Sequence, residues 1–310
     1  MIMHKIPIII DCDPGIDDAF ALAYASLSDA FDVLAIVSVA GNVALEDTTL
    51  NADFLMHNFN MNCPLYQGAS KPLIGDPIIA KYAHGSNGLG GYLFENDFKS
   101  SLISGNSSDL VFDHLKNSSE KVVIAAIGPL TNIAKLILAY PEAKQYIEEI
   151  VIMGGAIKRG NYTARAEFNI AADPLAAKIV FNSGINIKVL PLDTSESVHF
   201  YPEFFIKFRE TNQISRLLYK IVESKGLFDY PFNSLYLHDL LTLISIAHPE
   251  FFSLIHCNIN VETEGYLTKG ETVFDLRETS RKILPNGYYI SFKDSDVLIQ
   301  HCLEVLTHVH

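Results

Sequence analysis

The sequence predicts an α/β fold, with a mainly parallel central sheet flanked by helices and an active site at the C-terminal ends of the strands. An uninterrupted apolar run begins at Ile6, and such runs are typical of strands buried on both faces of a parallel sheet. Strand-like and helix-like stretches then alternate as far as Asp193, which is the pattern of a parallel sheet with helices on both faces. Polar side chains repeatedly follow the strands, and ligands of open α/β sheets bind where strands end.

The remaining elements are predicted in chain order. Strands are expected at 33–39, 122–127, 150–153 and 185–192, and helices at 18–27, 46–59, 129–138 and 174–181. Pro129 suits the first turn of its helix, and Asp173 suits the cap of the next one. Residues 66–110 are rich in Gly and Pro and contain no strong regular element. Because no linker, repeat or low-complexity tract divides the chain, we expect a single domain over 1–310 that ends in a short β-rich and helical annex after residue 255.

Composition excludes several classes of partner and location. The chain has 310 residues, of which 49% are hydrophobic, and this is ample for a sizeable core. A formal net charge of −13 argues against nucleic acid and anionic membranes as partners. No run of eighteen apolar residues predicts a transmembrane helix. The four cysteines are scattered and form no Cys-x-x-Cys pair, so we expect a protein of the reducing cytoplasm.

Four carboxylates directly follow the first strand, around a Pro-Gly turn: Asp11, Asp13, Asp17 and Asp18. Negative charges crowded at this point repel one another unless protons or a cation neutralise them. Carboxylate oxygens suit calcium or magnesium better than zinc, which favours Cys and His. The alternative is local: Asp17 would cap the following helix, and Asp18 would interact with the helix dipole. Capping accounts for one or two acids but not for four, so we favour a metal site.

Two further groups of polar residues have both a functional and a structural interpretation. Asn161, Glu167 and Asn169 follow a glycine-rich strand exit and offer donors and acceptors that suit a sugar, although such residues are also common in solvated loops. His238 and Asp239 interrupt an apolar stretch typical of a buried helix. They are either a satisfied core histidine with a capping aspartate, or a substrate-facing acid with a metal ligand.

The glycine-rich stretch 84–91 carries one histidine, His84, and is either a mobile flap over the site or a plain surface loop. An aromatic group further along the chain either stacks on a flat ligand or belongs to the core. Its members are Tyr219, Phe228, Tyr230, Phe232 and Tyr236.

Six motifs together resemble the inosine-uridine-preferring nucleoside hydrolases, a family of ribonucleoside N-glycosidases. The resemblance spans nearly the whole chain, and its first motif is highly specific. The motifs are Asp-Cys-Asp-Pro-Gly-Ile-Asp-Asp (11–18), Ala-Gly-Asn (40–42), Gly-Pro-Leu-Thr-Asn (128–132), Met-Gly-Gly (153–155), Ala-Glu-Phe-Asn (166–169) and His-Asp (238–239).

The resemblance implies a bound calcium ion and a ribose site. The implied calcium ligands are Asp13, Asp18, Asp239 and the backbone carbonyl of Ile127, where other members often have Thr. The implied substrate-binding residues are Asp17, Asn42, His84, Met153, Asn161, Glu167, Phe168 and Asn169. Asp11 is expected just behind them, orienting the ligands.

The resemblance also implies hydrolysis of the N-glycosidic bond to free base and ribose. Asp13 is then the general base for the attacking water, and His238 is the candidate acid for the leaving base. Because the chain contains no tryptophan to stack a purine, we expect pyrimidine nucleosides (uridine, cytidine) or an inosine–uridine preference. Family analogy suggests a homotetramer or homodimer.

Two rival functions remain at the level of the sequence. A magnesium-dependent aspartyl phosphatase of the haloacid dehalogenase type also opens with a strand and an Asp-x-Asp pair, in which Asp11 would be the nucleophile. Such enzymes usually continue into Gly-Thr or Gly-Ser, whereas Pro14 and Gly15 follow here. The second rival is a non-catalytic nucleoside or ribose sensor.

Overall fold

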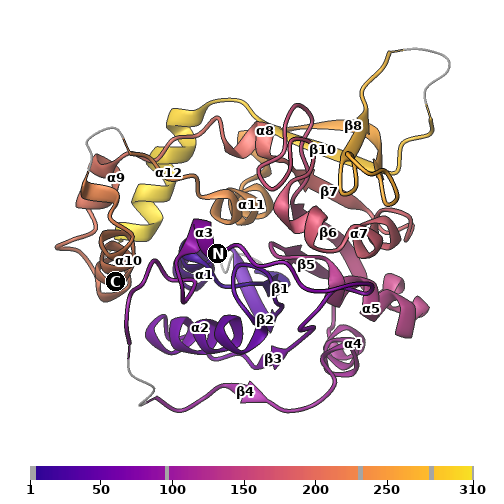
Figure 1. Ribbon diagram of the computed structural model, residues 1–310. Coiled ribbons are helices and arrows are strands. Elements are labelled where there is room, and N and C mark those ends of the chain that lie inside the picture. The colour runs from indigo at the N-terminus through magenta and orange to yellow at the C-terminus, as the bar shows by residue number, and fades with distance from the viewer. Residues whose placement is uncertain (1–4, 95–97, 230–232, 279–282, 309–310) are drawn as a thin grey trace.

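A computed structural model describes residues 5–94, 98–229, 233–278 and 283–308. Within these residues, ten strands form one sheet in the order β4-β3-β2-β1-β5-β6-β7-β10-β8-β9 (Figure 1). The strands are β1 (Ile6–Cys12), β2 (Phe31–Ser38), β3 (Leu65–Gln67), β4 (Leu102–Ile103), β5 (Val122–Ala126), β6 (Ile147–Met153), β7 (Ile187–Leu190), β8 (Phe252–Val261), β9 (Thr272–Asp275) and β10 (Gly287–Phe292).

Helices connect most of these strands and cover both faces of the sheet. The α-helices are α1 (Ile16–Leu27), α2 (Leu45–Asn58), α3 (Lys81–His84), α4 (Ser107–Asn117), α5 (Thr131–Ala139), α6 (Phe168–Ala172), α7 (Pro174–Phe181), α8 (Leu192–Ser195), α9 (Pro202–Ile206), α10 (Gln213–Ser224), α11 (His238–Ala247) and α12 (Ser295–Thr307). Short 3-10 helices lie at Pro141–Gln145, Leu227–Asp229 and Pro249–Phe251.

The strand order reverses at β1, and this reversal positions the site. β1 pairs with β2 on one side and with β5 on the other, and all pairs from β4 through β10 are parallel. Only β8 runs against its neighbours, β10 and β9. Connections from β1 and β5 therefore diverge to opposite faces, which leaves a crevice at the carboxyl ends of these two strands, where ligands of doubly wound sheets bind.

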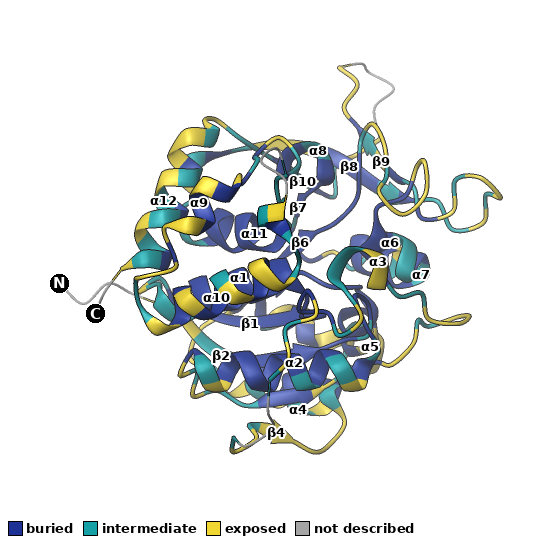
Figure 2. Ribbon diagram, turned by 60° about the vertical axis from the view of Figure 1, so that its left-hand side comes forward, coloured by how far each residue is buried: buried dark blue, intermediate teal, exposed yellow. Residues whose placement is uncertain are grey.

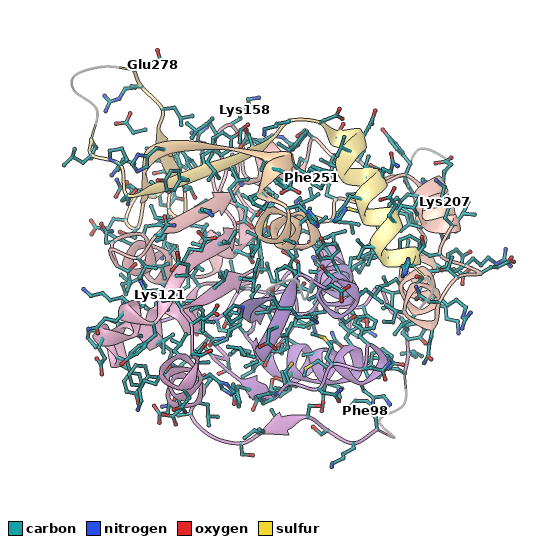
Figure 3. All side chains as sticks on the ribbon, turned by 180° about the vertical axis from the view of Figure 1, so that it is seen from behind. Phe98, Lys121, Lys158, Lys207, Phe251 and Glu278 are labelled. Atoms are coloured by element: carbon teal, nitrogen blue, oxygen red, sulfur yellow. The ribbon has the colours of Figure 1, made fainter. Side chains whose placement is uncertain are left out.

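Alternate residues of β1 supply two separate cores. Ile8 and Ile10 pack with α1, α2, α10, α11 and α12, whereas Ile9 packs with α4, α5 and α7. Figure 1 shows these two sets of helices on opposite sides of the sheet, and Figure 2 shows the central strands buried while outer helix faces are exposed. Seen from behind, side chains fill the space between the layers, and charged residues such as Lys121 and Lys207 lie at the periphery (Figure 3).

The strands and helices predicted up to residue 192 end within three residues of the observed bounds, but the roles expected of two residues at helix starts are wrong. Asp17 is not a cap: α1 begins at Ile16 with Gly15 as its N-cap, and the carboxylate of Asp18 accepts the Gly15 amide at 2.8 Å. Pro129 lies outside the first turn, because α5 begins at Thr131. The cap by Asp173 is confirmed, since its carboxylate accepts the amide of Ala176 at the start of α7.

Two regional predictions hold only in part. Residues 66–110 are not without regular structure, since they include most of β3, all of α3 and β4, and the start of α4. The expected annex after residue 255 does not form separately, because β8, β9 and β10 continue the same sheet beyond β7. Among the described residues, none of the helices combines the length and apolar character needed to cross a bilayer.

Candidate active site

A cavity opens at the carboxyl ends of β1, β2, β5 and β6. Every predicted substrate-binding residue lines it, together with the predicted catalytic pair and most of the predicted metal ligands. The predicted residues that line it are Asp13, Asp17, Asn42, His84, Ile127, Met153, Asn161, Glu167, Phe168, Asn169, His238 and Asp239.

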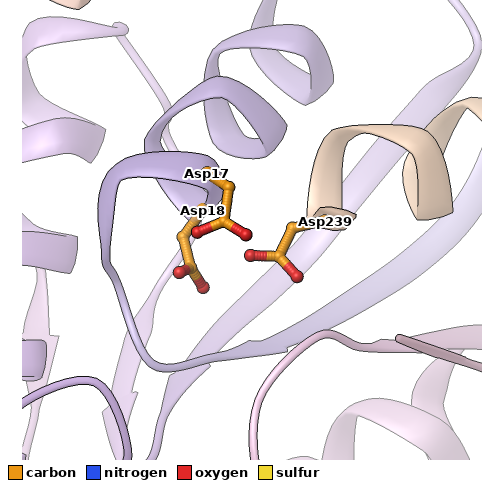
Figure 4. A group of neighbouring side chains, drawn as sticks. All are labelled: Asp17, Asp18 and Asp239. Carbon is orange, nitrogen blue, oxygen red and sulfur yellow. The ribbon is translucent and has the colours of Figure 1, made fainter. Parts of the chain in front are cut away.

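Three carboxylates from two helices form an acidic cluster beside this cavity. Asp17 and Asp18 lie at the start of α1 and Asp239 at the start of α11, and the three carboxylates face one another (Figure 4). Each offers an oxygen within 4.8 Å of the other two. Burial, and then the charge of Asp17, raises the pKa of Asp18 to about 7. Burial and the charges of Asp17 and Asp18 raise the pKa of Asp239 well above its ordinary value.

Asp18 has both a structural and an electrostatic place in this cluster. Its carboxylate accepts the backbone amides of Gly15 at 2.8 Å and Asp13 at 3.2 Å, so it closes the turn between β1 and α1. The carboxylate of Asp17 differs from that of Asp18, because Oδ1 of Asp17 is buried and has no hydrogen-bond partner among the described residues. An orphaned carboxylate oxygen within a group of three buried acids fits a hard cation, because such a cation takes oxygen ligands.

The carboxylate of Asp13 is held between two glycines. It accepts the backbone amide of Asn42 at 2.7 Å. A Cβ at Gly41 would lie 2.0 Å from its Oδ2, and a Cβ at Gly128 would lie 2.8 Å from its Oδ1. Glycine at both positions therefore lets loops after β2 and β5 close around Asp13. Burial, and then the charge of Asp18, raises the pKa of Asp13 well above its ordinary value.

Of the polar residues after β6, Glu167 and Asn169 are buried, whereas Asn161 is exposed. The carboxylate of Glu167 accepts the backbone amides of Gly155, Asn169 and Ile170 at 2.9–3.1 Å, which caps α6. Asn161 accepts the amide of Phe168 at 2.9 Å, so its side-chain NH₂ is left for the cavity. For Glu167 and Asn169, burial and these backbone contacts contradict the interpretation of a solvated loop.

The carbonyl of Ile127 also faces this group. It accepts the side-chain amide of Asn169 at 3.0 Å, and the same amide donates to the carbonyl of Met153 at 3.2 Å. A carbonyl oxygen has a second lone pair, so the contact with Asn169 is compatible with a further partner. The side-chain oxygen of Asn169 remains as an acceptor.

Two half-buried histidines line the cavity from different helices. Nδ1 of His238 lies 2.7 Å from Oγ of Ser195. Nδ1 of His84 accepts the backbone amide of Ile16 at 3.2 Å and lies 3.7 Å from Oδ1 of Asp17. Burial lowers the pKa of both histidines, and the charge of Asp17 partly offsets that effect.

Asp11 lies behind the cavity rather than in its wall. Its carboxylate accepts the side-chain amide of Asn132 at 2.8 Å, and burial raises its pKa to about 8. That amide also donates to the carbonyl of Ser38, and the side-chain oxygen of Asn132 accepts the amide of Ala69. The hydrogen bonds of Asp11 therefore connect β1 to the neighbouring loops, and its orienting role stays a prediction.

Sequence reasoning missed several residues of this region. Ala80, Tyr82 and Ala83 also line the cavity, because α3 places the start of the glycine-rich stretch at its mouth. The aromatic residue Tyr82, two positions before His84, was the sequence signal that could have indicated these additional cavity residues. In the aromatic group, Tyr219 and Phe228 stack on each other and pack against the core, with ring centroids 5.1 Å apart. The ring of Tyr236 lies 5.7 Å from that of His238, while Tyr230 and Phe232 lie outside the described residues.

Comparisons with known proteins agree with this geometry. The chain is 42% identical over 272 residues to an Escherichia coli protein named non-specific ribonucleoside hydrolase RihC, covering 88% of this chain and 89% of that protein. Among solved structures, the plant nucleoside hydrolase PpNRh1 is 28% identical with a TM-score of 0.89 and coverage of 99% and 100%. A purine-preferring ribonucleoside hydrolase from Gardnerella vaginalis is 25% identical with a TM-score of 0.88 and coverage of 97% and 98%.

The model of one protein family, described as inosine-uridine preferring nucleoside hydrolase, matches residues 8–297. This match covers almost the whole sheet and every residue of the cavity described above. Together with the 42% identity to a curated relative, it shows that the chain belongs to the inosine-uridine preferring nucleoside hydrolase family.

Proposed function

We propose that this nucleoside hydrolase uses calcium to hydrolyse the N-glycosidic bond of uridine, cytidine and inosine, releasing free base and ribose. The observation that carries the proposal is the convergence of buried acids, sugar-compatible amides and two histidines on one cavity. The cavity therefore holds carboxylates that can activate water and histidines that can protonate a leaving group, and the reaction needs both.

The ion would be held by Asp13, Asp18, Asp239 and the carbonyl of Ile127. All of these are oxygen donors, which calcium prefers. Asp18 and Asp239 belong to the acidic cluster, and its third member, Asp17, is assigned to the ribose. When bound, the ion supplies positive charge that holds sugar hydroxyls and favours loss of a proton from water.

The ribose would be bound by Asp17, Asn42, Asn161, Glu167 and Asn169, with Met153 and Phe168 against its apolar surface. The amide NH₂ of Asn42 is already donated to the backbone carbonyl of Asp13 at 2.9 Å, which leaves its oxygen for a sugar hydroxyl. Asn161 has the opposite arrangement, with its NH₂ left to donate. The pair thus matches a ligand whose hydroxyls both donate and accept.

Proton transfer would use both ends of the cavity. Asp13 accepts the proton of the attacking water, and His238 donates a proton to the departing base, with His84 beside the same base. Cleavage develops positive charge on the sugar ring, as in other glycoside hydrolyses, and nearby carboxylates stabilise that charge.

Base preference, location and assembly are parts of the same proposal. No tryptophan is present to stack a purine, so we infer a preference for pyrimidine nucleosides. The scattered cysteines and the charge of −13 support a cytoplasmic enzyme without a nucleic-acid or membrane partner. We further propose a homotetramer or homodimer.

A substrate panel tests the proposal. Purified protein is incubated with uridine, cytidine, inosine and adenosine, with calcium or after exhaustive chelation, and liberated ribose is measured. We expect ribose from the first three, fastest from the pyrimidines, and none after chelation until calcium is restored. Release of phosphate from a phosphomonoester panel without ribose release, or tight nucleoside binding without turnover, contradicts the proposal. Undiminished hydrolysis after chelation contradicts its calcium requirement.

A further inference from the structure

A serine outside the cavity wall makes a short contact with the candidate acid. Ser195 is the last residue of α8 and is fully buried. Its Oγ lies 2.7 Å from Nδ1 of His238, at the start of α11, and 3.3 Å from the carbonyl oxygen of Pro191. The two helices are 43 residues apart along the chain at this contact, so the fold itself brings the hydroxyl to the imidazole.

The donors and acceptors of these three groups allow an assignment of protons that the proposal adopts. The carbonyl of Pro191 can only accept, whereas a serine hydroxyl has one proton to donate and lone pairs to accept. When Ser195 donates to Pro191, it accepts a hydrogen bond from Nδ1–H of His238. Nε2, on the opposite edge of the ring, is then the nitrogen that carries the proton for the leaving base into the cavity, and the neutral Nδ1–H form remains after that proton has been transferred.

We propose that Ser195 is a positioning residue for the hydrolase, which fixes the ring of His238 so that Nε2 faces the leaving base. This inference rests on the proposed function and adds a residue that does not touch the substrate. Within the described part of the chain, the contact with Ser195 is the one hydrogen bond that the imidazole of His238 makes. The ring of Tyr236 lies 5.7 Å away and restricts it by packing alone.

The test compares Ser195→Ala with the wild-type enzyme on two substrates. Uridine needs help from an acid to expel its base, whereas 4-nitrophenyl riboside has a leaving group that departs without it. We expect kcat for uridine to fall about 10- to 100-fold with little change in KM, since general acid catalysis is worth roughly 100- to 10,000-fold and only its alignment is lost. The kcat for 4-nitrophenyl riboside should change less than about threefold.

Two further variants separate hydrogen bonding from packing. Ser195→Cys keeps nearly the same shape but forms only weak hydrogen bonds, so it should behave like Ser195→Ala. Ser197→Ala removes a hydroxyl two residues away that is exposed and contacts only backbone carbonyls, and it should retain wild-type rates. Circular dichroism of each variant establishes that it is folded.

The tautomer gives an independent readout. In ¹⁵N spectra of the histidine-labelled wild-type enzyme, neutral His238 should show the Nδ1–H form, and Ser195→Ala should show a mixture of both forms. The proposal is overturned if Ser195→Ala loses equal activity on both substrates, or if Ser195→Cys keeps wild-type activity. It is also overturned if His238 has the same tautomer in the wild type and in Ser195→Ala. If the wild-type enzyme releases no ribose from any nucleoside, the proposed function itself has failed, which is a distinct result.

Discussion

At the scale of single residues, the site depends on side chains that fulfil two requirements at once. Asp18 closes the turn before α1 through two backbone amides and also belongs to the acidic cluster. The position of Asp18 in the sequence was compatible with a local role at the helix start and with a role in a metal site. In the structure it closes the turn and also lies in the acidic cluster. The four neighbouring acids were therefore informative: the alternative of a cap by Asp17 does not occur, and Oδ1 of Asp17 has no hydrogen-bond partner in the described structure.

Glycine at position 41 is required by the carboxylate of Asp13. An added Cβ would lie 2.0 Å from Oδ2 of that side chain, far inside normal contact, so Gly41→Ala must displace it. We expect at least about a 100-fold loss of kcat for uridine, because a general base displaced by even 1 Å costs rates of that order. Steady-state kinetics checks this, with calcium affinity measured by calorimetry.

Gly287→Ala is the matched control for this steric effect. Its added Cβ would lie 2.9 Å from the carbonyl of Ile187, in the sheet and outside the cavity wall. We expect it to lower the melting temperature while the folded protein retains its kcat. If both variants lose activity equally per folded molecule, the effect of Gly41→Ala is not specific to Asp13.

The role of His238 can be tested by its removal. His238→Ala should slow uridine hydrolysis about 100-fold or more, because the base must then leave without a proton. Hydrolysis of 4-nitrophenyl riboside should change less than about tenfold, since its leaving group is already stable as an anion. Both rates are measured at saturating substrate, and an equal loss on both substrates removes His238 from the role of acid.

At the scale of elements, the sequence predicted long apolar strands and well-capped helices but not short elements. The run from Ile6 and the Asp173-Pro174 pair carry strong local signals, and β1 and α7 are close to their predictions. β3 and β4 have only three and two residues, too few for a pattern of hydrophobicity to reveal them. These two strands form because they pair at the edge of the sheet beside β2. Such a tertiary contact is not visible in a local sequence pattern.

β10 shows the same limit at the other end of the sheet. It pairs in parallel with β7 and antiparallel with β8, although β8 precedes it in the chain. No local sequence pattern indicates that β10, a later strand, lies between the earlier strands β7 and β8. The last strands therefore read as an annex in sequence, although they extend the main sheet.

Asp173 links α7 to two other elements, and its loss should be costly. Its carboxylate accepts the amides of Ala176 and Leu73 and the hydroxyl of Thr131, at 2.8–3.0 Å, and it is only 2% exposed. Asp173→Ala leaves buried donors without partners, so we expect a loss of about 2–4 kcal/mol in the free energy of unfolding. Urea denaturation measures this loss.

Asp294 provides the control for the capping part of that effect. It is the exposed N-cap of α12, and its carboxylate accepts only the amide of Asp296 within the described residues. Asp294→Ala should cost about 1 kcal/mol, the usual value of a cap. Equal losses for the two variants would contradict the importance of the contacts from Leu73 and Thr131.

At the scale of the whole molecule, strand order explains why motifs far apart in sequence meet. The reversal at β1 brings the exits of β1, β2, β5 and β6 to one rim, and α11 reaches the same rim from residue 238. Polar residues at strand ends predicted this convergence, because parallel strands share a carboxyl edge. The family resemblance predicted His84 of α3. The contributions of Ala80, Ala83 and α8 were not predictable, since they depend on how loops fold over that edge. The single domain over 1–310 stays a prediction.

The cost of collecting acids in the interior should appear in the stability of the calcium-free protein. Burial raises the pKa of Asp11 to about 8 and the pKa values of Asp18 and Glu167 to about 7, well above those in an unfolded chain. Between about pH 4 and pH 8 the folded state therefore holds more protons than the unfolded state. The free energy of unfolding must then fall as pH rises through this range, because the unfolded state releases those protons more readily.

Calcium should reverse this trend, since carboxylate ligands bind it in their deprotonated form. We expect the melting temperature after chelation to fall from pH 5 to pH 8, and the increase caused by excess calcium to be larger at pH 8 than at pH 5. Thermal melts at both pH values, with calcium or with chelator, measure both quantities. The Asp239→Asn variant is the control: it removes one charge from the cluster, so its chelated form should lose less stability with pH and respond weakly to calcium. A chelated wild-type protein whose stability rises toward pH 8 would contradict the inference that these buried acids are protonated without a cation.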